Sequence, residues 1–463
     1  MILINIKLVF GGNTLKVPEK APDWGKLLNE CISSELAMKT INIVRKANSE
    51  YLYWDDFKYQ PMPEGVAPES AWAMLKASRL FQTRDLSLAD SKGRPFSYWL
   101  PDCVLREIHL IDQQAGGAIL VEDPSVHSEE KRRYMIRSLV DEAISSSEIE
   151  GAVTTRVVAK EMLRTGRKPK DRSEHMIYNN YRSMQMIKRH LSEPLTIDLV
   201  NKIHASMTEN TLDVSLWAGR FGTPEDEEIH VFDSYGQILH VPPKAADLLA
   251  SMEKLCNFAN GDREDEFVNP IIKGILIHFW LAYVHPYMDG NGRTARALFY
   301  WYMLKHNYWL FEYLSVSTAI LNARARYYRS FLYSEMDDND ATYFIVYNLE
   351  AIHKALEIRN TYIERKQKEK KNTHRFAERY PVLNLRQRAL LSSALEKKHV
   401  IYTIETHANV HGVTYQTART DLLALKDMGL LELRKEGKKF IFTPVADIAI
   451  KLDSGTAEEK EIE

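Results

Sequence analysis

Cysteine is scarce in this sequence: three occur among 463 residues, scattered along the chain. Their number and spacing exclude a disulfide framework or a cysteine metal site, and they indicate a reducing compartment. No apolar run is long enough to span a bilayer, because the longest, from Ile275 to Val284, is interrupted by His278. Residues 1–10 lack the charged start and cleavage site of a signal peptide, and we interpret them as a strand or an arm. We therefore expect a cytoplasmic protein that has no membrane partner.

The sequence also lacks an excess of charge of either sign. Its 61 Lys and Arg residues nearly balance 63 Asp and Glu, which leaves a formal net charge of -2. No global electrostatic attraction to nucleic acid or to a membrane surface is expected from this balance. Hydrophobic residues make up 45% and charged residues 27% of the chain, as in an ordinary globular protein. A chain of this length exceeds one ordinary domain, and we expect two or three.

Most of the candidate chemistry lies in residues 285–296, whose sequence is HPYMDGNGRTAR. Apolar runs at helical spacing flank this stretch, which predicts a helix, a tight loop and a second helix. Gly290 and Gly292 allow the backbone to turn sharply, and they lead into a helix N-terminus, whose free N–H groups attract anions. Arg293 and Arg296 lie on one face of the first turn of that helix. Two cations beside these N–H groups favour a highly charged anion, and a polyphosphate fits best.

Two further side chains complete the candidate site. Asp289 is a hard oxygen ligand suited to Mg²⁺, which commonly binds through one or two carboxylates together with substrate phosphates. His285 can accept a proton near neutral pH. Taken singly, an Asp-Gly-Asn-Gly sequence is usually only a turn, and a lone histidine is usually structural. The joint pattern at fixed offsets favours a site for a metal-bound nucleotide.

This stretch resembles the signature of the Fic family, H-x-F-x-[DE]-G-N-[GK]-R-x-x-R, and departs from it only at Tyr287, where the family has Phe. We expect the exchange to be tolerated if the tyrosine hydroxyl finds a partner. The resemblance implies a protein adenylyltransferase that moves AMP from ATP to a Tyr, Thr or Ser hydroxyl, with pyrophosphate as the leaving group. It implies these roles: His285 as the base, Asp289 as the Mg²⁺ ligand, Gly290, Asn291 and Gly292 as the anion hole, Arg293 as a phosphate contact, and Arg296 as the γ-phosphate contact.

A second motif lies upstream, at the end of a long helix expected over about 129–151. A carboxylate at Glu150 opposes the helix dipole, which a buried cationic partner would resolve; a solvated surface glutamate is the ordinary alternative. Ser146, Glu150 and Gly151 match the inhibitory motif [ST]-x-x-x-E-[GN] of Fic proteins. The resemblance implies that Glu150 pairs with Arg296 and blocks the pose of the ATP γ-phosphate. In some relatives this glutamate also supports the removal of AMP.

A β-hairpin is predicted over residues 229–241, where two short apolar strands flank a turn that ends at Gly236. In a helical domain such a hairpin can serve simply as a flap packed on helices. In Fic proteins the corresponding flap lies over the active site and pairs with the backbone of the target, and the resemblance implies β-strand addition here. The strand residues assigned to target docking are Ile229, His230, Val231, Phe232, Ile238 and Leu239.

Residues 381–447 are expected to form a separate module of helices followed by two short strands. This order resembles the winged helix-turn-helix of bacterial repressors, whose second helix faces the major groove of DNA while wing lysines meet phosphates. A winged helix that serves homodimer formation or protein contacts is an equal alternative. The candidate DNA-contacting residues are Thr414, Gln416, Thr417 and Arg419.

The expected fold is mostly α. It comprises an N-terminal accessory region (1–105), a Fic helical core with the inhibitory helix and a small β-hairpin flap (106–363), a charged linker (364–380), the winged helix (381–447) and an acidic tail (448–463). The expected function is that of an autoinhibited protein adenylyltransferase that uses ATP and Mg²⁺. Two alternatives stay open: a nucleotide-sensing, DNA-binding transcriptional regulator, and a Fic enzyme that transfers UMP or phosphate or removes AMP.

Overall fold

Two compact units, Met1–Glu357 and Ile358–Glu463, make up the computed structural model of the protein, and the boundary between them lies within helix α15 (Thr342–Arg379). Helices dominate both units, as the sequence predicts. The finer domain boundaries expected from the sequence stay predictions, and the acidic tail lies almost entirely outside the described residues. The structure describes residues 4–7, 17–31, 33–115, 128–226, 229–232, 236, 238–261, 267–379, 383–396, 401–436, 439–448 and 451.

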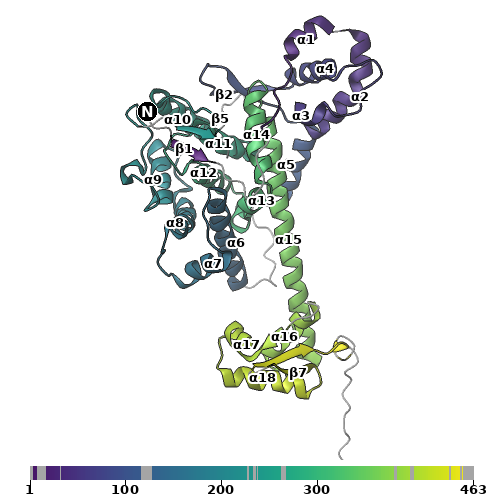
Figure 1. Ribbon diagram of the computed structural model, residues 1–463, viewed down its shortest axis with the longest axis vertical. Coiled ribbons are helices and arrows are strands. Elements are labelled where there is room, and N and C mark those ends of the chain that lie inside the picture. The colour runs from purple at the N-terminus through teal and green to yellow at the C-terminus, as the bar shows by residue number, and fades with distance from the viewer. Residues whose placement is uncertain are drawn as a thin grey trace, which may run out of the picture. The chain divides into compact units, whose positions relative to one another are not determined.

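The first four helices and their connections pack around Trp72, which is fully buried. Edge-to-face contacts join the Trp72 ring to Tyr53, at 6.2 Å between ring centroids, and to Trp54, at 5.7 Å. Tyr343 belongs to the same apolar cluster, so these helices are anchored to the start of α15 (Figure 1). The four helices are α1 (Trp24–Cys31), α2 (Ser34–Glu50), α3 (Trp54–Phe57) and α4 (Pro68–Leu80).

An antiparallel pair of strands follows, β2 (Arg84–Ala89) and β3 (Pro95–Tyr98). The N–H of Ser97 donates to Asn339 O at 3.0 Å, and Ser97 O accepts from the N–H of Ala341 at 2.8 Å. These two bonds fasten β3 to the residues just before α15. Helix α5 (Asp102–Ala115) comes next in the chain.

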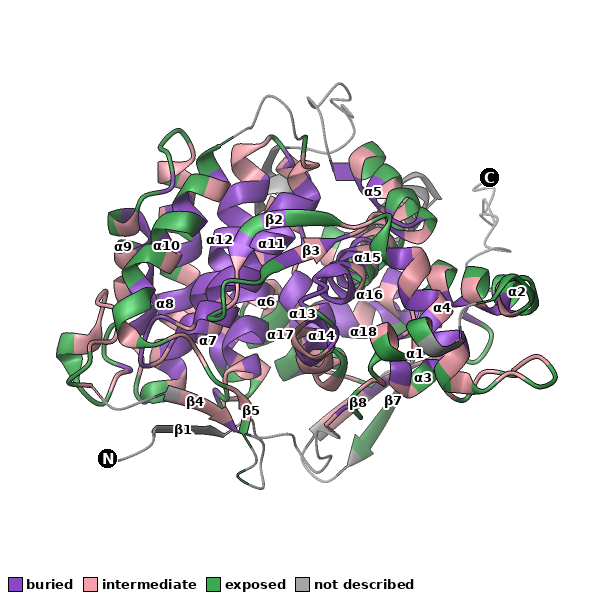
Figure 2. Ribbon diagram, turned by 90° about the horizontal axis from the view of Figure 1, so that it is seen from above, coloured by how far each residue is buried: buried purple, intermediate pink, exposed green. Residues whose placement is uncertain are grey.

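The centre of the first unit is formed by α11 (Pro270–Val284) and α12 (Asn291–Lys305). Every residue from Ile271 to Leu281 is buried, as in a helix that other elements surround on all sides (Figure 2). Asn269 caps α11 by accepting the N–H of Ile271 at 2.9 Å. None of the described helices is both long and apolar enough to cross a membrane. The other helices of this unit are α6 (Ser128–Ile149), α7 (Arg156–Thr165), α8 (Arg172–Ile187), α9 (Ile197–Thr208), α10 (Ala245–Asn260), α13 (Val316–Asn322) and α14 (Arg324–Met336), with 3₁₀ helices η1 (Lys188–His190), η2 (Ser215–Trp217) and η3 (Trp309–Tyr313).

The predicted hairpin is present as β4 (Ile229–Phe232) and β5 (Ile238–His240), which pair antiparallel. Of the predicted turn, only Gly236 is among the described residues. The hairpin is part of a larger sheet, because β1 (Ile4–Lys7) pairs in parallel with β4 and gives the strand order β1-β4-β5. A strand or arm is expected for residues 1–10, but its place against β4 follows only from the structure.

The second unit consists of the last part of α15 and a small helical module with a three-stranded antiparallel sheet, in the strand order β6-β8-β7. Its core gathers leucines of two helices around Phe442. Residues 364–379, expected as a charged linker, continue α15 as a helix. The elements of the module are α16 (Leu385–Glu396), β6 (Tyr402–Thr403), α17 (Ile404–His411), α18 (Tyr415–Asp427), β7 (Leu431–Glu436) and β8 (Lys439–Pro444).

Candidate active site

The loop between α11 and α12 has a tightly defined backbone. His285 ends α11 in the left-handed region, at φ 49°, and its N–H donates to Leu281 O at 3.0 Å. The Asn291 side chain bridges the loop, because its Oδ1 accepts the N–H of Tyr287 at 3.0 Å and its Nδ2 donates to Tyr287 O at 2.6 Å. A left-handed non-glycine residue costs free energy and is typical of functional sites, where the surrounding contacts enforce it.

The Tyr287 side chain is fully buried, and its hydroxyl donates to Asn201 Oδ1 at 2.8 Å. Its ring stacks on His204, with 3.6 Å between centroids and 3° between planes. The Fic signature has Phe at this position, and we expect Tyr to be tolerated there if its hydroxyl has a hydrogen-bond partner. Asn201 is that partner.

Replacing Tyr287 with Phe removes the only atom that separates this loop from the Fic signature. We expect the free energy of unfolding to fall by about 1 kcal/mol, because Asn201 then loses a partly buried hydrogen bond. Urea denaturation measures the difference. The double variant with Asn201→Ala should cost clearly less than the sum of the single changes, since both remove the same bond. Additive costs would contradict the coupling.

His204 is a site residue that the sequence does not single out. Its Nδ1 accepts the N–H of Gly219 at 2.9 Å, so the other nitrogen, Nε2, carries the proton and donates to Asp289 O at 2.7 Å. Burial lowers the pKa of His204 to about 4, which keeps the ring neutral as this bonding requires. A Cβ on Gly290 would collide with Thr208 Cγ2, so α9 packs directly against the loop.

The start of α12 holds buried hydrogen-bond donors that have no acceptor among the residues that the structure describes. Arg293 is fully buried; its Nη1 donates to Met207 O at 2.9 Å, whereas Nε and Nη2 find no acceptor among the described residues. The same holds for Nη1 of Arg296. Burial lowers the pKa of Arg293, because the cation is costly in this environment. Each unmet buried donor costs about 1–3 kcal/mol, which an anionic ligand would recover. These donors therefore fit the phosphates of a nucleotide.

Glu150 lies at the place where such an anion would bind. Its Oε1 accepts from Arg296 Nη2 at 2.9 Å. Ser146 contributes two more acceptors to the same guanidinium, its Oγ at 2.9 Å from Nε and its carbonyl oxygen at 2.8 Å from Nη2. A Cβ on Gly292 would collide with Glu150 Oε1, so the carboxylate lies against the backbone at the start of α12. Gly151 follows with a left-handed φ of 89°, as the end of α6 requires.

Asp289 presents its carboxylate partly to solvent, with 38% of the side chain exposed. Oδ1 accepts the N–H of Gly290 at 2.6 Å, and Oδ2 lies 3.1 Å from Arg172 Nη2 and 3.8 Å from Arg293 Nη2. Arg172, at the start of α8, is a second residue that the sequence does not mark. Within the described part of the chain no group of three acidic, histidine or cysteine side chains could hold a metal. One exposed carboxylate fits Mg²⁺ that takes its other ligands from substrate phosphates and water.

His285 has the properties of a proton acceptor. Its Nδ1 lies 3.4 Å from Ala282 O, and its buried Nε2 has no hydrogen-bond partner in the part of the protein that the structure describes. Burial, together with the nearby charge of His240, lowers the pKa of His285 to about 4. The imidazole is therefore neutral at pH 7 and can accept a proton.

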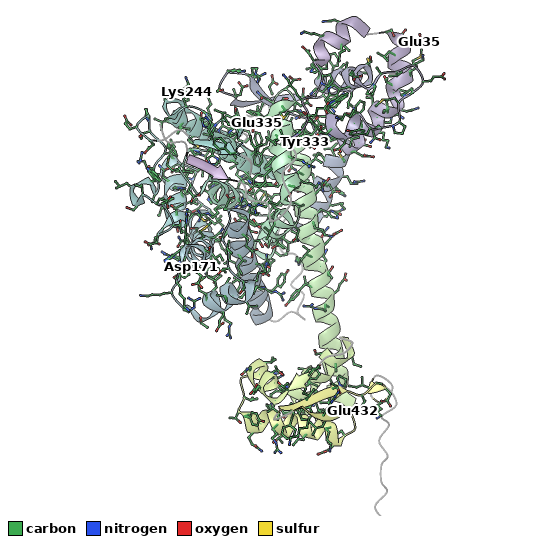
Figure 3. All side chains as sticks on the ribbon, in the orientation of Figure 1. Glu35, Asp171, Lys244, Tyr333, Glu335 and Glu432 are labelled. Atoms are coloured by element: carbon green, nitrogen blue, oxygen red, sulfur yellow. The ribbon has the colours of Figure 1, made fainter. Side chains whose placement is uncertain are left out.

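His240 fastens the hairpin beside His285. Its Nδ1 lies 2.7 Å from Glu335 Oε2, and its Nε2 lies 2.7 Å from Tyr283 O, so both nitrogens donate (Figure 3 labels Glu335). Burial lowers the pKa of His240, but the Glu335 charge more than offsets this, and the pKa lies above its ordinary value. The end of β5 is thus bound to the last turn of α11, next to His285.

The residues assigned to target docking all lie in the hairpin: Ile229, His230, Val231 and Phe232 form β4, and Ile238 and Leu239 belong to β5. The outer edge of β4 is occupied by β1. The outer edge of β5 pairs with no other strand that the structure describes, and Ile238 is half exposed. An extended peptide could therefore add to β5 directly, or to β4 after displacing β1.

The four candidate DNA-contacting residues lie at the start of α18 in the second unit. Thr414 caps this helix, since its hydroxyl accepts the N–H of Thr417 at 3.2 Å and lies 2.9 Å from the Thr417 hydroxyl. Gln416 and Arg419 are exposed, three positions apart on the helix. Thr414 is exposed as well, whereas Thr417 is half-buried, so three of the four residues are exposed and two of the four form the helix cap.

Residues 194–303 match the sequence model of the Fic/DOC family. The chain contains a Fic/DOC family domain. The matched range contains the whole 285–296 loop, the β4–β5 hairpin and His204, but not Glu150. The family resemblance seen in the loop sequence is thereby confirmed.

Two curated relatives are Fic protein adenylyltransferases. This Fic/DOC chain is 36% identical over 110 residues to Protein adenylyltransferase Fic of Nematostella vectensis. The aligned residues cover 23% of this chain and 22% of the relative. It is 33% identical over 69 residues to the protein of the same name from Drosophila grimshawi, and this alignment covers 15% of this chain and 14% of the relative. The chain thus matches no more than about a fifth of the length of these relatives.

Among solved structures, Fic-1 from C. elegans (residues 134–508) aligns with a TM-score of 0.49 and 17% identity over 74% of this chain and 92% of that chain. A Fic family protein from Desulfovibrio desulfuricans G20 aligns with a TM-score of 0.45 and 18% identity, over 74% and 94% of the two chains.

Proposed function

We propose that this Fic/DOC protein is an autoinhibited protein adenylyltransferase, which transfers AMP from ATP to a Tyr, Thr or Ser hydroxyl of a target protein or of itself. The observation that carries the proposal is the set of buried, unmet donors of Arg293 and Arg296 at one helix start, close to a neutral histidine. Transfer of AMP to a hydroxyl requires a site for the phosphates of ATP beside a group that accepts the hydroxyl proton.

The reaction follows from the atoms available. Nε2 of His285 accepts the proton of the target hydroxyl, and the hydroxyl oxygen forms a bond to the α-phosphorus of ATP. The bond from that phosphorus to the β-phosphate oxygen breaks, and pyrophosphate leaves. Arg293, Arg296 and the N–H groups at the start of α12 hold the phosphates, so positioning and electrostatics supply most of the catalysis. Mg²⁺ on Asp289 would neutralise phosphate charge.

Inhibition rests on competition for one guanidinium. A carboxylate and a γ-phosphate both take the planar fork of an arginine as a donor pair. Glu150 and Ser146 already engage Nε and Nη2 of Arg296. A γ-phosphate would have to displace Glu150 to approach this guanidinium, so with Glu150 in place ATP would bind without the phosphate alignment that attack requires.

The test is to incubate the Glu150→Gly variant with ATP labelled in either the α or the γ position. Transfer of AMP labels protein from [α-³²P]ATP alone, whereas transfer of phosphate labels it from [γ-³²P]ATP. Competition by unlabelled UTP, CTP and GTP identifies the preferred donor. The absence of α-label in any protein would remove the proposal.

The Asp289→Asn substitution should lower kcat/KM for ATP at least about 10-fold at low Mg²⁺, because the amide is a poorer ligand for a hard cation. Part of the loss should return as Mg²⁺ is raised. Asp213→Asn is the matched control, since Asp213 also faces Arg172, at 3.9 Å, but forms no hydrogen bond or ion pair with the 285–296 loop among the described residues. An unchanged Mg²⁺ dependence in Asp289→Asn would contradict the assignment. Both variants are measured with Glu150→Gly.

A second candidate function is that of a DNA-binding regulator whose nucleotide site only senses ATP. It is favoured by the exposed Gln416 and Arg419 on α18 and by the exposed Arg434 and Lys435 on β7. Binding to genomic DNA fragments, with affinity that falls steeply with salt, would support it. Binding of DNA without α-label transfer would favour the regulator, and the reverse would favour the enzyme.

A further inference from the structure

Helix α6 faces the core with a stripe of polar side chains spaced four residues apart, Ser138, Glu142 and Ser146, which Glu150 extends just beyond the helix end. Each of them bonds to an element other than α6. The hydroxyl of Ser138 donates to Tyr313 O at 3.0 Å. Ser146 and Glu150 accept from Arg296, as described above. The remaining member, Glu142, has the most bonds.

Glu142 is a buried carboxylate, 2% exposed, that accepts four hydrogen bonds. Its Oε2 accepts from Tyr300 Oη at 2.8 Å, from Ser315 Oγ at 3.1 Å and from the N–H of Ser317 at 3.0 Å. Its Oε1 accepts from Ser317 Oγ at 2.5 Å. Tyr300 belongs to α12, the helix that carries Arg296, and Ser317 belongs to α13. One side chain therefore ties α6 to two elements at once.

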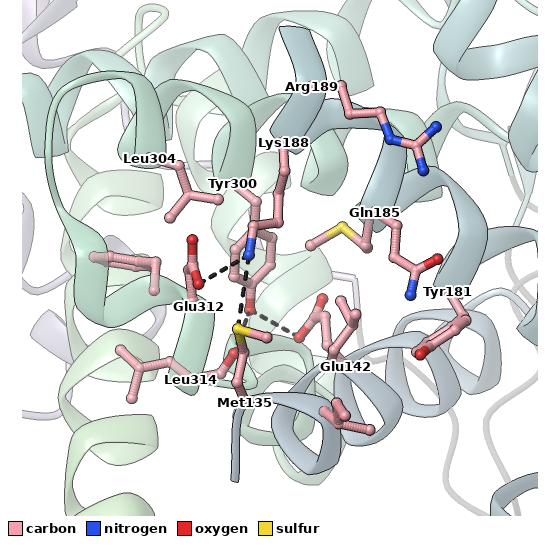
Figure 4. Close-up of a pocket in the computed structure, with 14 residues that line it drawn as sticks. Met135, Glu142, Tyr181, Gln185, Lys188, Arg189, Tyr300, Leu304, Glu312 and Leu314 are labelled. Carbon is pink, nitrogen blue, oxygen red and sulfur yellow. Dashed lines mark hydrogen bonds and ion pairs between the residues drawn. The ribbon is translucent and has the colours of Figure 1, made fainter. Parts of the chain in front are cut away.

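Apolar packing of α6 is incomplete beside Glu142. An open pocket of about 320 Å³ lies between α6, α8, α12 and η3, and Glu142 and Tyr300 form part of its wall (Figure 4). Side-chain atoms that face this pocket have no protein atoms packed against them on that side, so they lose dispersion contacts. The attachment of α6 in this region therefore depends more on the hydrogen bonds of Glu142 than it would in a filled interface. The apolar residues that line the pocket include Met135, Leu139, Met184, Leu304, Phe311 and Leu314.

We propose that Glu142 is the positioning residue that holds α6 in place and thereby keeps Glu150 on Arg296. This inference rests on the proposed function. An α-helix is stiff over two turns, so an anchor at Glu142 sets the position of the helix end, which lies about 10 Å away. Without the anchor, α6 shifts, and the bond between Glu150 and Arg296 is lost or lengthened with that shift.

The test compares substitutions in two backgrounds. Glu142→Ala should raise AMP transfer at least about fivefold in the wild-type background. In the Glu150→Gly background it should change transfer less than about twofold, because no carboxylate is left to misplace. Ser317→Ala, which removes one of the four bonds, should act in the same direction with a smaller effect. Glu142→Gln should restore most of the inhibition, since its amide oxygen can accept from Tyr300, Ser315 and Ser317.

Asp141→Ala is the matched control. Asp141 is the neighbouring carboxylate on α6, but it faces α7 through Lys160 at 2.7 Å, and its loss should leave transfer unchanged. If Glu142→Ala lowered AMP transfer equally in both backgrounds, Glu142 would serve core stability alone, and the proposal would be overturned. An unchanged rate of AMP transfer on Glu142→Ala in the wild-type background would also overturn it. Should Glu142→Ala fail to fold, the result with Ser317→Ala decides. A Glu150→Gly protein without any α-label would instead defeat the proposed function.

Discussion

Glu150→Gly is expected to transfer AMP about 10- to 100-fold faster than the wild-type protein, to itself as well as to targets. The carboxylate pairs with Arg296 and lies against Gly292 at the start of α12. Its removal clears the space beside the guanidinium and beside Gly292 for the γ-phosphate. The measurement is the initial rate of protein labelling from [α-³²P]ATP.

Two comparisons separate the carboxylate from the general effect of a glycine near a helix end. Glu148→Gly should stay inhibited, because Glu148 pairs with Arg156 at 3.1 Å and not with Arg296. Glu150→Gln keeps a hydrogen-bond acceptor but loses the charge, so its rate should lie between those of the wild type and Glu150→Gly. Equal incorporation of label by the wild type and Glu150→Gly would refute the inhibitory role of Glu150.

Loss of the His285 imidazole is expected to lower transfer roughly 100- to 10,000-fold, the usual contribution of a general base. Asn is the better replacement, because His285 adopts a left-handed conformation that Asn tolerates and Ala does not. ATP should still bind to His285→Asn, since Arg293 and Arg296 hold the phosphates. Transfer and ATP affinity are both measured in the Glu150→Gly background, the latter by calorimetry.

The pH dependence gives an independent check on His285. Because burial lowers its pKa to about 4, the imidazole stays unprotonated as the pH falls from about 8 to about 6. Protonation of this group should therefore cause no loss of AMP transfer in that pH range.

The outcome that would contradict the role of His285 as the base comes from the substitution: AMP transfer that persists in His285→Asn would remove this assignment.

Much of the candidate site could be predicted from local sequence. The helix–loop–helix around residues 285–296 follows from apolar periodicity and two glycines, and the structure places α11 and α12 accordingly. The end of the upstream helix near Glu150 and the hairpin at 229–240 follow from equally local patterns. All these features depend on residues a few positions apart, whose spacing sets which face they share.

Apart from the Glu150–Arg296 pair, which the inhibitory motif implies, the contacts between distant segments in the site were decided by tertiary structure. His204 and Arg172 reach Asp289 from α9 and α8, and Glu142 reaches Tyr300 from α6. The pairing of β1 with β4 joins segments that lie more than 200 residues apart in the chain. A lone histidine or glutamate in a helix carries no mark of its eventual partner, because burial and bonding depend on how whole helices pack together. The sequence by itself indicated which groups are candidates for binding a nucleotide. Packing decided which of their donors lie buried without an acceptor among the described residues, because that depends on how whole helices meet.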